Sequence, residues 1–99
     1  MKVDSKTRAK LRAIASTIQP SVIIGKDGVT ENVVKQINMD LDARELIKIT
    51  VLENDIDYKQ MLNDLAGKLN AEPVCSIGKK LVLYRYSNKK KVNHVLDVK

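Results

Sequence analysis

The sequence has few of the residues on which base stacking, metal binding and catalysis depend. It contains no Trp, no Phe and only three Tyr, too few to supply the exposed aromatic side chains on which single-stranded bases stack. One His and one Cys exclude an intramolecular disulfide and leave no cluster with metal-ligand spacing. No apolar run reaches the roughly 18 residues of a membrane-spanning helix. We therefore expect no enzyme, no metal or other cofactor, no small-molecule substrate and no membrane partner.

The length and composition fit a single small domain. A chain of 99 residues is too short for two domains, and an apolar content of 43% is sufficient for a core. The first ten residues, MKVDSKTRAK, show no apolar run after their charges, so we expect no secretory signal. A single thiol fits a reducing compartment. The simplest expectation is a cytoplasmic monomer.

Basic residues are concentrated at the two ends of the chain. The formal net charge is +6, yet most acidic residues lie between residues 27 and 72, and residues 1–26 and 73–99 have a strong excess of Lys and Arg. If both ends fold onto one side, that side would attract a polyanion. The basic residues could equally serve only to increase solubility. A third interpretation is an interaction module whose acidic middle docks a basic protein.

Hydrophobic periodicity predicts three helices and four strands, in the order α-β-α-β-α-β-β. The expected helices cover residues 5–16, 31–43 and about 55–69, and the expected strands cover residues 21–25, 45–52, 73–78 and 80–86. Strand–helix–strand units usually place their strands in parallel, and the closing hairpin at Gly78–Lys79 adds an antiparallel strand. We predict a compact two-layer α/β domain with a mixed four-stranded sheet over residues 1–86, followed by a basic appendage at residues 87–99.

Some single positions carry more specific expectations. Thr30 is expected to cap the second helix, and Asn54 or Asp55 to cap the third. The segment SVIIG should be a fully buried strand, and Cys75 an inert thiol in an interior strand. His94 lies in the basic appendage, where a solvated side chain is expected rather than a general base.

The segment IIGKDGVT places a short glycine loop between a predicted strand and a predicted helix. Gly25 and Gly28 are separated by two residues, whereas a P-loop needs four, and the third glycine of the dinucleotide fingerprint is missing. The spacing fits a GxxG loop, whose small ends let a nucleic-acid backbone approach its amides. The helix N-terminus after it favours phosphate, and Lys26 adds a cation, while Asp27 caps the turn or faces away. Glycines also occur in such turns for steric reasons alone.

Further basic candidates lie in the first helix and near the last hairpin. Arg8 and Arg12 are four residues apart on one flank of the apolar stripe, and Lys6 and Lys10 lie on the other. We expect this helix to share a surface with the glycine loop. The complete set of candidate polyanion contacts is Gly25, Lys26, Asp27, Gly28, Thr30, Arg8, Arg12, Lys6, Lys10, Lys79, Lys80 and Arg85.

Four stretches, KLRAIA, PSVIIGKDGVTENVV, ELIKI and KLVLYR, occur in an order that resembles the CRM (chloroplast RNA splicing and ribosome maturation) domain, in particular its stand-alone bacterial YhbY-like form. The match runs from about Lys6 to Arg85. It implies a non-catalytic RNA-binding domain, similar in fold to the C-terminal domain of the third bacterial initiation factor. It also implies association with ribosomal RNA in precursors of the large ribosomal subunit, with the family's GxxG on residues 25–28. With so few aromatic residues, we expect contacts to phosphates and RNA shape to dominate.

Overall fold

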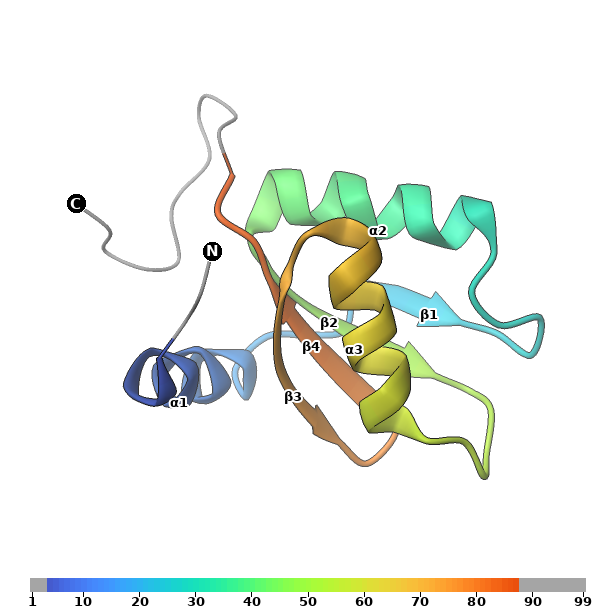
Figure 1. The fold of residues 1–99 in the computed structure, drawn as a ribbon, viewed down its shortest axis with the longest axis horizontal. Helices are drawn as coiled ribbons and strands as arrows, with labels where there is room; N and C mark the ends of the chain where they lie inside the picture. The colour runs from blue at the N-terminus through green and yellow to red at the C-terminus, as the bar shows by residue number, and fades with distance from the viewer. Residues whose placement is uncertain (1–3, 88–99) are drawn as a thin grey trace.

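The computed structural model describes residues 4–87 and contains three helices and four strands in the predicted order (Figure 1). The elements are α1 (Ser5–Ala15), β1 (Val22–Ile24), α2 (Glu31–Arg44), β2 (Leu46–Val51), α3 (Tyr58–Leu69), β3 (Glu72–Ile77) and β4 (Lys80–Tyr84). The predicted fold class, a small α/β domain with a mixed four-stranded sheet, is confirmed. The basic appendage beyond Ser87, including Lys89, Lys90, Lys91 and His94, lies outside the described residues.

The strand order in the sheet is β1-β2-β4-β3. β1 pairs with β2 in parallel, as the crossover through α2 predicts, and β4 is antiparallel to both of its neighbours. The last strand therefore lies between β2 and β3, and β1 and β3 form the two edges. Gly78 takes a φ of 57° in the predicted tight turn between β3 and β4.

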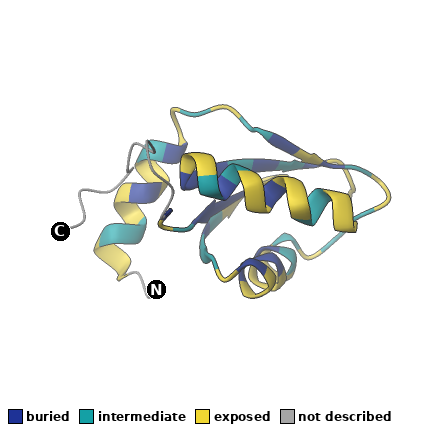
Figure 2. Ribbon diagram, turned by 90° about the horizontal axis from the view of Figure 1, so that it is seen from above, coloured by how far each residue is buried: buried dark blue, intermediate teal, exposed yellow. Residues whose placement is uncertain are grey.

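Residues alternate between two cores along the central strands. Ile47 and Ile49 of β2 and Leu83 of β4 belong to the larger cluster, which α2 and α3 cover. Leu46 and Tyr84 belong to a smaller cluster with Leu11 and Ala15 of α1. Because side chains alternate along a strand, α1 packs on the face of the sheet opposite to α2 and α3. Figure 2 shows the exposed residues gathered on the outer sides of the helices and in the loops.

The helix caps explain where α2 and α3 begin. Thr30 caps α2 as predicted, its hydroxyl oxygen accepting a hydrogen bond from the Val33 N–H at 3.2 Å. The predicted cap of the third helix is wrong, because Asp57 takes that role and accepts from the Gln60 N–H at 3.0 Å. Ile56 before the cap and Met61 after it pack against the same cluster, the arrangement of a hydrophobic staple, which favours this later start.

Two burial predictions are also wrong, and both errors concern edge strands. Ile23, in the middle of the SVIIG segment, is 60% exposed because β1 is an edge strand and α1 does not cover it. Cys75 lies on the other edge strand, β3, and is half-buried rather than interior. Both side chains point to the face of the sheet on which α1 packs, because Ile23 is paired with Thr50 and Cys75 with Val82.

Candidate functional site

The GKDG loop is a tight turn with a charged, exposed tip. The Gly28 N–H donates a hydrogen bond to the Gly25 carbonyl at 3.0 Å, and Lys26 and Asp27 project at the tip. Gly28 has a φ of 76°, which favours glycine on conformational grounds. Gly25 has no such requirement, and a β-carbon at Gly25 would meet no atom within 4 Å. The fold therefore explains Gly28 but gives no internal reason for Gly25.

The loop leads directly into the N-terminus of α2. A helix leaves its first backbone amides without intrahelical partners. Here the Val33 N–H donates a hydrogen bond to the Thr30 hydroxyl oxygen. The remaining amides of the first turn, together with the positive end of the helix dipole, favour an anion. Glu31 opposes that preference with an exposed carboxylate in the first turn. The loop can thus offer backbone donors and one lysine to a phosphate.

The GKDG loop shares one end of the sheet with the β3–β4 hairpin. The Leu52 N–H donates to the Ile24 carbonyl at 3.0 Å, and the Val51 N–H donates to the Lys79 carbonyl at 2.8 Å. These bonds place the ends of β1 and β2 beside the hairpin turn. Lys79 and Lys80 are both exposed there. Three of the predicted cationic residues, Lys26, Lys79 and Lys80, therefore lie at the same end, which we call the loop end.

The structure does not bring α1 to the loop end. α1 packs on Leu46, the first residue of β2, and on Tyr84, the last residue of β4, which places it at the other end of the sheet (Figure 1). The chain leaves α1 to enter β1 at one end and leaves β1 for the GKDG loop at the other. Lys6, Lys10 and Arg12 are exposed on α1. The expected single surface of first helix and loop is therefore not formed by direct contact.

The two other arginines among the candidate contacts, Arg8 and Arg85, have partners within the fold. Arg85 donates to the backbone carbonyls of Asn38 (3.0 Å) and Leu69 (2.8 Å), to Asn38 Oδ1 (2.9 Å) and to Asp42 (3.0 Å), and its side chain is only 19% exposed. These bonds tie α2 to the end of α3, so we assign Arg85 a structural role, contrary to its place among the expected contacts. Arg8 pairs with Glu72 at 3.0 Å and keeps 44% of its side chain exposed.

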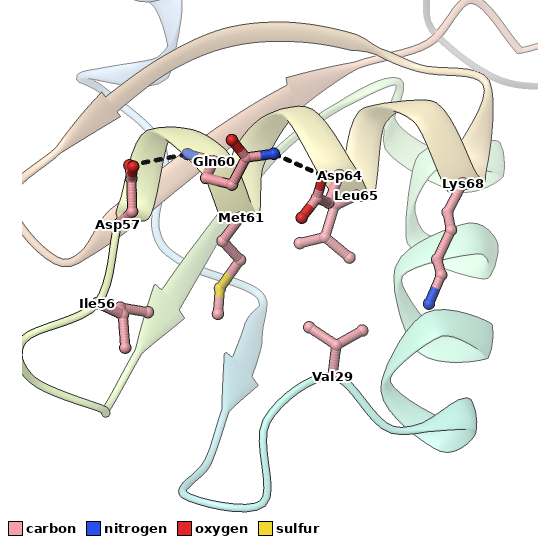
Figure 3. A pocket seen from close by; sticks show the side chains of 8 residues that line it. All are labelled: Val29, Ile56, Asp57, Gln60, Met61, Asp64, Leu65 and Lys68. Atoms are coloured by element: carbon pink, nitrogen blue, oxygen red, sulfur yellow. Dashed lines mark hydrogen bonds between the residues drawn. The ribbon is translucent and has the colours of Figure 1, made fainter.

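A hollow of about 350 Å³ lies next to the loop, between Val29 and α3 (Figure 3). It is lined by Val29, Ile56, Asp57, Gln60, Met61, Asp64, Leu65 and Lys68. Gln60 donates to Asp64 Oδ1 at 2.9 Å, so two carboxylates and one lysine surround an apolar floor. The sequence pattern alone does not reveal this hollow, although Val29 directly follows the loop and the α3 residues recur at helical spacing. Its excess of acid suits a cationic or apolar group better than a phosphate.

Residues 4–87 offer little support for a metal site, a membrane-spanning helix or a reactive thiol. No three His, Cys, Asp or Glu residues of that range converge as metal ligands. None of its helices is long and apolar enough to cross a membrane. Burial raises the pKa of the Cys75 thiol, and this effect outweighs the nearby charges of Arg12 and Lys48, which lower it. The thiol is therefore protonated at neutral pH, which disfavours nucleophilic chemistry.

Comparisons with known proteins match nearly the whole chain to one family. The model of the CRS1 / YhbY (CRM) domain matches residues 3–85. The chain is 40% identical over 90 residues to the probable RNA-binding protein YqeI of Bacillus subtilis, covering 87% of this chain and 91% of that protein. It is 35% identical over 91 residues to an RNA-binding protein of Haemophilus influenzae, covering 91% and 92% of the two chains.

A solved structure gives the same result. The solution structure of SAV1595 from Staphylococcus aureus superposes with a TM-score of 0.80 at 40% identity, covering 91% of this chain and 95% of that one. Because the family model spans residues 3–85 and these relatives align over most of both chains, this chain belongs to the CRS1 / YhbY (CRM) domain family.

Proposed function

We propose that this protein binds RNA and that the GKDG loop holds the RNA backbone. The relatives named as RNA-binding proteins align with nearly the whole chain, the loop included. The loop end supplies the chemistry that such binding needs, namely backbone amides at a helix N-terminus and the exposed side chains of Lys26, Lys79 and Lys80. The observation that carries the proposal is Gly25, whose lack of a side chain neither its backbone conformation nor its packing explains.

The proposed target is ribosomal RNA in precursors of the large ribosomal subunit, bound by a cytoplasmic monomer without catalysis. The resemblance to the stand-alone bacterial form of the family supports this target. The chemistry of the surface supports a backbone-reading mode, because none of the three tyrosines forms a stacking platform. Tyr84 is buried, Tyr58 packs against the core, and only Tyr86 is exposed, at 37%.

Crosslinking in living cells tests the target. The protein is crosslinked to RNA, purified under denaturing conditions, and the attached RNA is sequenced. We expect enrichment of large-subunit ribosomal RNA over messenger and transfer RNA, and depletion of those reads in a strain that carries Lys26→Ala. Reads spread over all RNA classes in proportion to their abundance would contradict the ribosomal target.

A second candidate function rests on the hollow beside α3. Its apolar floor, flanked by Asp57 and Asp64, would suit the side chain of a basic protein. RNase treatment of a cell extract separates the two functions. Release of the protein from pre-ribosomal particles supports RNA contacts, whereas retention that is lost in a Met61→Glu variant supports protein docking.

A further inference from the structure

Within residues 4–87, α1 covers only part of one face of the sheet. The pairings Ile23↔Thr50, Thr50↔Lys80 and Lys80↔Ile77 place these four residues in one row across the face on which α1 packs. Ile23 is 60% exposed and Ile77 is 52% exposed, because α1 covers only the opposite end of this face. This row borders the loop end. Only Ile24 separates Ile23 from the GKDG loop, and Lys80 directly follows the hairpin turn.

The next row carries further basic charge. The pairings Lys48↔Val82 and Val82↔Cys75 place Lys48 and Cys75 on the same face. Lys48 and Arg12 are both close enough to the Cys75 thiol for their charges to oppose the rise of its pKa caused by burial, so one basic side chain of β2 and one of α1 lie near the same residue of the sheet. Lys48 and Lys80 are diagonal neighbours on adjacent antiparallel strands, roughly 7–8 Å apart at their backbones.

The strands place little negative charge on this face. Glu72, paired with Tyr84, is the one carboxylate that β1 to β4 direct to it, and Arg8 neutralises Glu72 through the ion pair at 3.0 Å. Arg12, Lys48 and Lys80 therefore form a strip of positive charge that runs from α1 to the loop end. Such a strip is the electrostatic footprint of a nucleic-acid backbone.

We propose that RNA crosses this face of the sheet, with Arg12, Lys48 and Lys80 on its phosphates, and so connects α1 with the GKDG loop. The inference rests on the proposed RNA-binding function and adds a path and a new contact residue, Lys48. Ile23 and Ile77 flank the strip and would contact sugars and base edges. No aromatic side chain of β1 to β4 is exposed on this face, since Tyr84 is buried under α1, so the path tolerates any sequence.

Lys48→Ala tests the new contact, with Lys59→Ala as the matched control. Lys59 is an exposed lysine of α3, which packs on the other face of the sheet. Affinity for purified large-subunit ribosomal RNA is measured as a function of salt, and thermal unfolding confirms that both variants fold. We expect Lys48→Ala to reduce the slope of log affinity against log salt by roughly 0.7–0.9, and Lys59→Ala to leave it unchanged. Equal slopes for wild type and Lys48→Ala would overturn the path.

Alkylation of Cys75 tests the same path without any substitution. It is the one cysteine of the chain, and it lies in the same row of the sheet as Lys48, on the face where α1 packs. We expect bound ribosomal RNA to slow its reaction with iodoacetamide several-fold, and an unchanged rate at saturating RNA would overturn the inference. If Lys26→Ala weakens binding while Cys75 stays unprotected, the path fails and the proposed function stands. If the wild-type protein does not bind RNA at all, both fail.

Discussion

At the scale of single residues, the structure separates side chains that hold the fold from those free to meet a ligand. Arg85 is the clearest case, because the sequence shows only a basic residue at the end of a strand. Which carbonyls it meets depends on how α2 and α3 pack, and no local pattern carries that information. Gly25 and Gly28 differ in the same way, since they look equivalent in the sequence and only Gly28 has a positive φ.

Replacing Arg85 with Ala should destabilise the protein without a matching loss of RNA affinity. The change removes bonds to two backbone carbonyls and leaves Asp42 without its ion-pair partner. We expect a loss of about 2 kcal/mol in the free energy of unfolding, measured by urea denaturation. Lys79→Ala is the control, because its side chain is exposed and its loss should change stability by less than about 0.5 kcal/mol. If Arg85→Ala has wild-type stability but binds RNA more weakly, Arg85 contacts RNA and does not have the structural role assigned to it.

At the scale of helices and strands, the periodic pattern was sufficient to predict every element and the mixed sheet. It could not predict that β4 inserts between β2 and β3, because strand order depends on long-range pairing. That insertion makes β3 an edge and accounts for the unexpected exposure of Cys75, whereas Ile23 is exposed because β1 pairs only with β2 and α1 does not cover it. The helix starts show the same limit, since several acidic residues precede α3 and packing of Ile56 selects Asp57 as the cap.

The start of α1 should be sensitive to acid. Hydrogen bonds from the Thr7 side chain and from the Thr7 N–H, the latter at 2.7 Å, lower the pKa of the Asp4 carboxyl below its ordinary value of 3.8. A lowered folded-state pKa means that the ionised cap stabilises the helix above pH 3.8 and that this contribution is lost as the pH falls through the folded-state pKa. We expect amide exchange of the first turn of α1 to accelerate in that window.

Asp4→Asn is the control for the acid effect, because an amide still caps the helix but does not titrate. In this variant the first turn of α1 should show no acceleration over the same acidic range, beyond the intrinsic pH dependence of exchange. An acceleration equal to that of the wild type would show that another group causes the fraying.

At the scale of the whole molecule, the exposed basic candidate residues that the structure describes lie at both ends of the sheet rather than on one compact patch. The loop end carries Lys26, Lys79 and Lys80, and α1 carries Lys6, Lys10 and Arg12 at the far end (Figure 1). The overall charge asymmetry could be seen in the sequence. The strip that joins the two ends could not, because it depends on strand register, and Lys48 lies in a segment whose overall charge is acidic.

The salt dependence of RNA binding should report how much of the molecule the RNA touches. About four phosphates at the loop end alone would give a slope of log affinity against log salt near −3, and about two more on the sheet face would give a slope near −4. We expect the steeper value for the wild-type protein with ribosomal RNA, measured by filter binding. A wild-type slope near −3 that Lys48→Ala leaves unchanged would confine the RNA to the loop end.

The most direct test of the central claim, that the GKDG loop holds an RNA backbone, is the affinity of Gly25→Val for large-subunit ribosomal RNA. A β-carbon at Gly25 meets no atom within 4 Å and the position has no positive φ, so the variant should fold with near-normal stability. Gly67→Val on α3, where a β-carbon is equally unhindered, controls for the added side chain. We predict that Gly25→Val binds at least about tenfold more weakly, equivalent to about 1.4 kcal/mol, and that Gly67→Val binds like the wild type. A folded Gly25→Val protein with wild-type affinity would contradict the claim.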